Sequence, residues 1–193
     1  MVANATTHND AITNCEALAN SEATDSLMRA RLHSALSWLY AQMNNAAASE
    51  VAISNIPQDH RTDPIVANNL GNTYLKAKRF SVALAQYDEA LSGVKALGAI
   101  KALSGTTALS AKTALSEIKA TAAADTERAT VAAIHFNRSL ALRGLGRYEN
   151  AFDAYQAYLL AQPAQPGRIT DPAVQADSVV PDAIPSQLIP HSQ

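Results

Sequence analysis

Cysteine and aromatic side chains are scarce in this sequence. Cys15 is the single cysteine among 193 residues, and aromatic residues make up only 5% of the chain. One cysteine cannot form a disulfide within the chain, so we expect a reducing, cytoplasmic environment. A β-sandwich needs strands rich in β-branched and aromatic residues, which this composition does not provide.

The chain also lacks an excess of charge and a long apolar segment. Its formal net charge of −2 gives no overall attraction to a phosphate backbone, so nucleic acid is not an expected partner. No apolar run approaches the roughly 20 residues of a membrane-spanning helix, so we expect no membrane association. The first ten residues have neither the basic nor the apolar region of a signal peptide.

No motif for catalysis or metal binding stands out. The five histidines, at positions 8, 33, 60, 135 and 191, do not have the spacing of metal ligands. Gly144 and Gly146 belong to a predicted helix turn rather than to a phosphate-binding loop, and Cys15 has no evident activating partner. We therefore expect no cofactor, no metal and no enzyme activity.

Alanine, in contrast, is abundant and supplies 40 of the 193 residues. It is the best helix former, and its small side chain lets helices pack closely. The composition therefore predicts an all-α fold. Residues 1–22 are weakly patterned and are expected to be a loose segment or one irregular helix. Residues 25–48 have helical hydrophobic spacing, with Asp25 as N-cap and Asn44 and Asn45 weakening the end.

Asp63-Pro64 is the clearest helix start in the chain. Aspartate caps a helix, and proline suits the first helical position because its missing N–H would be unpaired there. This helix is expected to run to about Ala77. A second helix follows from Phe80, and its hydrophobic spacing continues to a break at Gly105.

The second half of the chain is less regular. Residues 108–124 predict either a modest helix or a mobile excursion. A long helix is expected after Asp125, ending near Arg143, and a last helix over 147–161. Six of the eight prolines and no aromatic residue lie in 163–193, so this segment is expected to be an extended or disordered tail that is solvated, carries a short linear motif or wraps over the helices.

Two stretches, 69–91 and 136–155, share one pattern. Each pairs a helix with a small residue at its middle and a second helix of the form aromatic-x-x-Ala-x-x-x-Tyr. The matching residues are Leu70, Gly71, Tyr74, Phe80, Ala83, Tyr87 and Ala90 in the first stretch and Ser139, Tyr148, Ala151 and Tyr155 in the second. The pattern resembles the tetratricopeptide repeat, a 34-residue helix–turn–helix. The resemblance implies antiparallel helical hairpins in a short right-handed α-solenoid.

The spacing of the small residues indicates a third, degenerate unit. Gly71 and Ser139 are 68 residues apart, which is two periods of 34, and Ser37 lies one period before Gly71. The second clear unit departs from the pattern at Leu142, in place of an aromatic residue, and at Tyr158, in place of alanine. The chain is expected to divide into a loose segment 1–22, a helical domain 23–162 and a Pro-rich tail 163–193. Within the helical domain, the units are expected near 30–56, 64–97 and 132–163, with an Ala-rich insertion over 98–131.

The matched residues are interpreted as packing residues. The two helices of a unit are expected to approach closely where Gly71 meets Ala83 and where Ser139 meets Ala151. The aromatic residues are expected to fill the space between one unit and the next.

In the family, the first helices of the units line a concave groove that binds a peptide or helix of another protein. The resemblance implies a groove lined by Asn68, Asn72, Leu75, Lys76, Asn137 and Arg143. Some members hold a C-terminal carboxylate with a lysine and asparagines; Asn72 and Asn137 match these asparagines, but Asn68 stands in place of the lysine. A co-chaperone type of carboxylate binding is therefore the weaker expectation.

Two alternatives stay open. The asparagines can instead order the packing between units. The helices can also serve assembly or regulation in a signalling complex by self-association, which makes a homo-oligomer possible. An enzyme on a helical scaffold is a third class for which no residue pattern was found.

Overall fold

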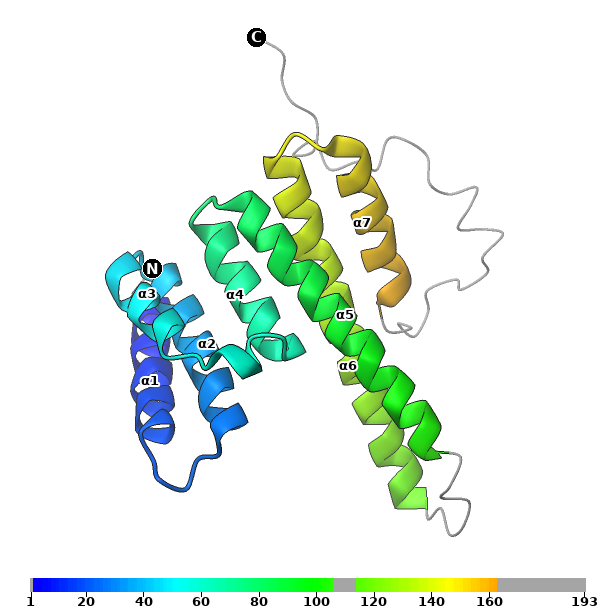
Figure 1. Cartoon of the computed structure of the whole chain (residues 1–193), viewed down its shortest axis with the longest axis horizontal. Coiled ribbons are helices and arrows are strands. Elements are labelled where there is room, and N and C mark those ends of the chain that lie inside the picture. Colours follow the sequence, from blue (N-terminus) through cyan, green and yellow to red (C-terminus); the bar gives the residue numbers. More distant parts are fainter. Residues whose placement is uncertain (1, 106–113, 163–193) are drawn as a thin grey trace.

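The computed structural model describes residues 2–105 and 114–162. These residues form α-helices, one short 3₁₀-helix and no β-strand, which confirms the all-α prediction for the described part of the chain (Figure 1). The expected Pro-rich tail, residues 163–193, lies outside the described residues. The helices are α1 (Val2–Ala19), α2 (Ser26–Gln42), α3 (Ala46–Ser54), η1 (Gln58–His60), α4 (Pro64–Lys76), α5 (Phe80–Gly105), α6 (Ala114–Gly144) and α7 (Tyr148–Ala161).

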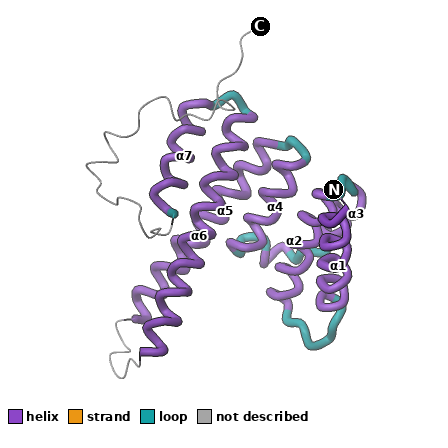
Figure 2. The backbone as a smooth tube through the Cα atoms, turned by 180° about the vertical axis from the view of Figure 1, so that it is seen from behind, coloured by secondary structure: helices purple, strands orange, loops and turns teal. Residues whose placement is uncertain are grey.

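Helices that follow one another in sequence pack against one another. α2 and α3, α4 and α5, and α6 and α7 form hairpins joined by short turns, and α1 packs on α2. α2 also contacts α4, and α6 contacts α5 and α4. Figures 1 and 2 show α5 and α6 continuing together well beyond the other helices as a two-helix projection.

Residues Val2–Ala19 form a helix, which is the second of the two alternatives expected for 1–22 and not the loose segment. Two expected helix boundaries differ from the structure. The helix expected over 25–48 is interrupted after Gln42, and α3 begins at Ala46. The helix expected to start after Asp125 already begins at Ala114, within the expected insertion, because its alanine-rich first turns are good helix formers even without a clear apolar stripe.

Aspartate residues start α2 and α4 as the sequence predicts. Asp25 accepts a hydrogen bond from the backbone N–H of Met28 at 2.7 Å. Asp63 accepts from the N–H groups of Ile65 and Val66, and Pro64 occupies the first helical position. These bonds satisfy N–H groups that have no partner within the helix.

The three hairpin turns share one backbone motif that the sequence did not reveal. Asn44, Lys78 and Gly146 all have positive φ, at 59°, 58° and 72°. In each turn the next residue donates to a carbonyl five positions back, as Arg147 does to Leu142 at 2.9 Å. This is the Schellman ending of a helix. The three residues are separated by 34 and 68 positions, which is the same period as the small residues.

The core consists of three neighbouring clusters. One lies between α1, α2 and α3, around Ile12 and Leu36. The second joins α2 to α4 through Ala30, Val66 and Leu70. The third and largest lies among α4, α5, α6 and α7, and its buried members are Ala67, Ala83, Leu84, Tyr87, Ala90, Ile134, Ala141, Leu142, Ala151 and Ala154.

Polar contacts also hold α2 against α4. The hydroxyls of Ser37 and Thr73 lie 3.0 Å apart in a buried position, and Asn69 donates to the Ser34 hydroxyl at 3.0 Å. Arg31 on α2 makes a two-pronged ion pair with Asp63, with a shortest distance of 2.7 Å. Because these groups are largely shielded from water, each must keep its partner, which fixes how α4 lies on α2.

Lys78 provides a test of the shared turn motif. A side chain at positive φ is strained, whereas glycine is not. We expect Lys78→Gly to raise the free energy of unfolding by about 1 kcal/mol, measured by urea denaturation. Lys95→Gly, in the interior of α5, is the matched control and should lower it by about 1 kcal/mol; a loss of stability in both variants would contradict the motif.

Asp63 provides a pH test. Burial alone would raise the pKa of this carboxyl, but hydrogen bonds from Arg31 and from the backbone of Val66 and Ile65 outweigh it, and the net pKa lies below the ordinary 3.8. The stabilisation is therefore present above that ordinary value and is lost as the pH falls through the lower folded-state pKa.

We expect Asp63→Asn to lower the free energy of unfolding at pH 7 by about 2–4 kcal/mol, because the Arg31 partner and part of the cap are lost. Urea denaturation from pH 7 to pH 2 should show the wild type converging toward the variant at the acid end. Asp59→Asn, at an exposed carboxylate, is the control and should change little. A constant gap between wild type and Asp63→Asn at every pH would contradict the assignment.

Candidate protein-binding groove on α4 and α6

A hydrogen-bonded network joins α4, α5 and α6. Oδ1 of Asn72 accepts from the Tyr87 hydroxyl at 2.8 Å and from Nδ2 of Asn137 at 2.9 Å. Asn72 and Asn137 are the two expected groove residues that match the asparagines of carboxylate-binding family members, and the structure brings them into direct contact. They lie 65 positions apart in the sequence.

The buried Tyr87 side chain supports this pair through its hydroxyl, which donates to Asn72. Tyr87 is fully buried, and burial raises the pKa of its phenol, so that the hydroxyl stays protonated and donates to Asn72. The sequence identified Tyr87 only as a packing residue. The sequence did contain a signal for this bond: a tyrosine at a position expected to be buried usually needs a hydrogen-bond partner for its hydroxyl.

The two amides keep unused hydrogen-bonding groups. Asn72 Nδ2 donates to no group among the described residues, and Asn137 Oδ1 accepts from none of them. Both residues are half-buried. An open donor and an open acceptor therefore lie beside each other on neighbouring helices, held by the Tyr87 hydroxyl. A peptide group carries one donor and one acceptor, so it is the simplest complement to this pair.

Asn68 and Asn69 have different surroundings. Asn68 lies one turn before Asn72 on the same face of α4, and its Oδ1 is buried without a hydrogen bond in the described part of the chain. Asn69 donates to Ser34 and belongs to the contact with α2. The four asparagines thus divide between a polar strip, formed by Asn68, Asn72 and Asn137, and helix packing.

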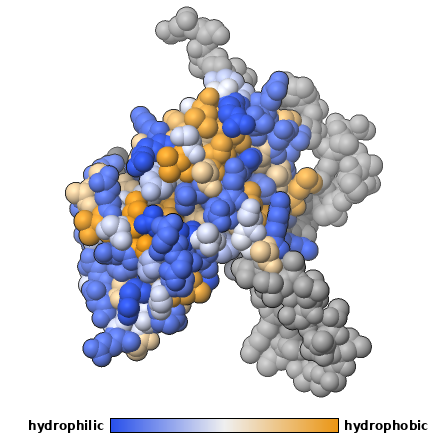
Figure 3. All heavy atoms as spheres, viewed as in Figure 1, coloured by the Kyte–Doolittle hydropathy of each residue, from blue (hydrophilic) through white to orange (hydrophobic). Residues whose placement is uncertain are grey.

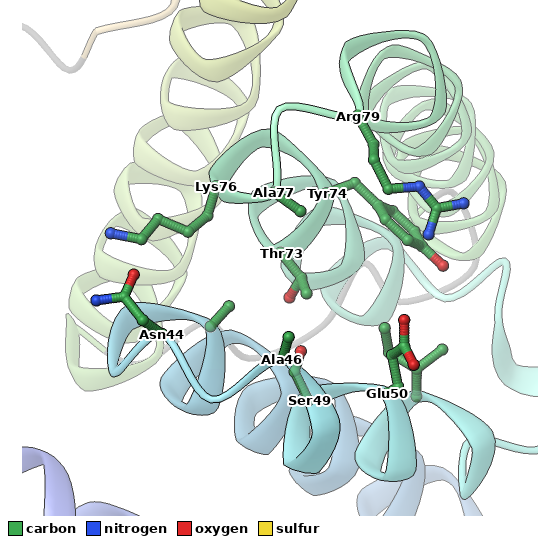
Figure 4. Close-up of a pocket in the computed structure, with 11 residues that line it drawn as sticks. Asn44, Ala46, Ser49, Glu50, Thr73, Tyr74, Lys76, Ala77 and Arg79 are labelled. Carbon is green, nitrogen blue, oxygen red and sulfur yellow. The ribbon is translucent and has the colours of Figure 1, made fainter.

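The other three expected groove residues have different surroundings. Leu75 is partly buried against the main core. Lys76 is exposed and lines a cavity on the side of α3, where its side chain extends toward Asn44 (Figure 4). Arg143 is half-buried near the end of α6. Of the six residues, the structure joins Asn72 and Asn137 by a hydrogen bond, and Asn68 and Lys76 lie one turn before and one turn after Asn72 on α4.

The cavity has a volume of about 240 Å³ and lies between the α2–α3 hairpin and the end of α4. Figure 4 shows Thr73 from α4 opposite Ala46 and Ser49 from α3, whose short side chains leave the space open. At the edge, the Arg79 guanidinium stacks on the Tyr74 ring at 4.9 Å. Ligand pockets usually exceed about 300 Å³, so a single side chain of a partner suits this space better than a cofactor does.

The expected packing residues are mostly buried. Leu70, Gly71, Ala83, Tyr87, Ala90, Ser139 and Ala151 are buried, Tyr74, Phe80 and Tyr155 are half-buried, and Tyr148 is exposed. The Tyr87 ring lies against Gly71, a contact that the sequence did not suggest: a Cβ on Gly71 would come within 2.5 Å of it. Gly93 similarly leaves room for Pro64, a contact that the sequence did not suggest.

Ionisable groups elsewhere form no second candidate site. Among residues 2–105 and 114–162, no three His, Cys, Asp or Glu side chains gather where they could hold a metal ion. Burial raises the pKa of the Cys15 thiol, which lowers its thiolate fraction at neutral pH. None of the described helices is both long enough and apolar enough to cross a membrane.

Comparison with protein-family models, with curated proteins and with solved structures found no match to this chain. The resemblance to the tetratricopeptide repeat therefore depends on the sequence pattern described above. The candidate groove depends on the geometry of Asn72, Asn137 and Tyr87.

Removing the Tyr87 hydroxyl tests the network. We expect Tyr87→Phe to lower the free energy of unfolding by about 1–2 kcal/mol, because Asn72 loses a buried hydrogen bond while the ring packing is kept. Urea denaturation measures the change. Tyr74→Phe is the matched control, since the Tyr74 hydroxyl has no hydrogen bond among the described residues, and it should alter stability by only a few tenths of a kcal/mol. Equal losses in the two variants would show that the network contributes nothing.

Proposed function

We propose that this chain is a tetratricopeptide-like, cytoplasmic protein-binding module, and that the polar strip of Asn68, Asn72 and Asn137 binds the main chain of a peptide from another protein. The observation that carries the proposal is the open donor and acceptor on the Asn72–Asn137 pair. Tyr87 holds Asn72, and Asn72 holds Asn137, before binding, so little side-chain freedom is lost when a peptide docks.

The strip is suited to an uncharged main chain rather than to a terminal carboxylate. Carboxylate recognition gains most from cations, and Asn68 stands where the related groove has its lysine. Lys76, one turn after Asn72 on α4, lines the cavity beside α3. We therefore expect main-chain hydrogen bonds to supply orientation and the cavity near Tyr74 and Ile53 to accept one side chain of the bound segment.

Display of a random peptide library against the immobilised chain tests this proposal, because the library samples many peptide sequences and requires no named partner. Selected peptides should bind the wild type and should bind Asn137→Ala roughly tenfold more weakly, because one or two hydrogen bonds are lost. Asn137 is chosen because its removal leaves the Tyr87–Asn72 bond intact. Affinities are measured by calorimetry or fluorescence anisotropy.

Asn69→Ala is the matched control, since this amide also lies on α4 but faces Ser34. It should leave peptide affinity unchanged even if it lowers stability. Equal affinity of Asn137→Ala and wild type for every selected peptide would overturn the proposal. Tight binding that needs a free C-terminus, and is lost on amidation, would favour carboxylate recognition instead.

A further inference from the structure

The α6–α7 hairpin exposes aromatic side chains at positions whose equivalents in the α4–α5 hairpin are more deeply buried. Residues 68 positions apart occupy equivalent places in the two hairpins. Tyr87 of α5 is fully buried and Leu84 is 9% exposed. Their counterparts on α7 are Tyr155, which is half-buried, and Phe152, which is 39% exposed.

The difference arises because α6 covers α4–α5. The ring of Phe80 lies against Gly144 of α6, where a Cβ would come within 2.6 Å of it, and Tyr87 is tied to α6 through Asn72 and Asn137. No described helix takes the corresponding place on α6–α7. Tyr148, the counterpart of Phe80, is consequently 49% exposed.

The exposed rings extend across both helices of the hairpin. Phe136 on α6 is 39% exposed and contacts Tyr158, with ring centroids 5.3 Å apart, and Tyr158 contacts Tyr155 at 5.5 Å. Leu160 near the end of α7 is also exposed. Apolar surface gathers in the upper part of Figure 3, near the turn between α6 and α7. Clustered exposed aromatic residues mark an interaction surface. We refer to Phe136, Tyr148, Phe152, Tyr155 and Tyr158 as the aromatic face.

We propose that residues 163–193 of the same chain bind this aromatic face. They follow the end of α7 directly, and they contain six of the eight prolines and no aromatic residue. Proline-rich segments bind aromatic surfaces because a polyproline II backbone is already extended and loses little entropy on docking. The aliphatic residues available to fill gaps between the rings are Ile169, Val174, Val179, Val180, Ile184, Leu188 and Ile189.

Length and area favour this occupant over a second copy. The 14 residues of α7 span about 21 Å, which about seven residues of polyproline II cover at roughly 3.1 Å each. The face consists of five aromatic side chains of about 150–250 Å² each, none more than about half exposed, so it offers only a few hundred Å², well below the roughly 800 Å² per partner of a stable interface. A small contact suffices when the ligand is covalently attached, because its effective concentration is on the order of millimolar.

Photocrosslinking in the full-length chain tests the proposal. Phe152→p-benzoylphenylalanine keeps an aromatic ring at an exposed position, and mass spectrometry of the irradiated protein should find its crosslinks within 163–193 of the same molecule. Their yield should not change over a roughly hundredfold dilution, as expected of an intramolecular contact. Tyr148→p-benzoylphenylalanine is a second probe in case the first perturbs folding, which circular dichroism checks.

Val51→p-benzoylphenylalanine is the matched control, since Val51 is an exposed apolar residue of α3 and should give no crosslinks to 163–193. Changing Val179, Val180, Ile184 and Leu188 to Ser should reduce the yield from position 152 about tenfold, by removing apolar contacts of the segment. Crosslinks that join two molecules and vanish on dilution would assign the face to a second copy and overturn the proposal. Absence of crosslinks to 163–193, or an unchanged yield in the Ser variant, would overturn it as well.

Discussion

The ring of Tyr87 against Gly71 is the contact on which the rest of the central structure depends. Because Gly71 has no side chain, the ring reaches the backbone of α4 and is fully buried there. Its hydroxyl then meets Asn72, which also accepts from Asn137 on α6. One side chain therefore sets the separation of two helices, and its polar end positions the third. A larger residue at position 71 would displace the ring and, with it, the amide pair on the surface.

The features that were predictable from the sequence are those that depend on neighbours along the chain. The start of α4 at Pro64 followed from Asp63 and proline alone. The end of α5 at Gly105 followed from the glycine and its Ser and Thr neighbours, which come where the hydrophobic spacing stops. The division of α2 from α3 was missed because it depends on the positive φ of Asn44. Asparagine tolerates positive φ, but its presence alone does not predict it. Comparing Asn44 with Lys78 and Gly146, which lie one and three periods of 34 residues later, would have revealed it.

For the candidate groove, the sequence pointed to two amides that the structure joins by a hydrogen bond, but not to the tyrosine that supports them. Asn72 and Asn137 were paired by a family pattern, whereas the role of Tyr87 depends on a third helix and emerges only in three dimensions. Lys76 was also predicted to line the groove. It lies one turn after Asn72 on α4 and lines the cavity beside α3, which the short side chains of Ala46 and Ser49 leave open. That cavity depends on how α3 packs beside α4, which no local pattern in the sequence encodes.

The two-helix projection of α5 and α6 has a consequence for how this chain can vary. The members of the main core for which burial is described fall between Ala67 and Val94 and between Ile134 and Ala154, and Figure 1 shows α5 and α6 continuing together past the other helices. Adding or removing about seven residues on each helix would change the reach of the projection by roughly 10 Å. Such paired changes leave every contact around Tyr87 intact. The distance between the candidate groove and the tip of the projection can therefore change without altering the packed helices that carry both.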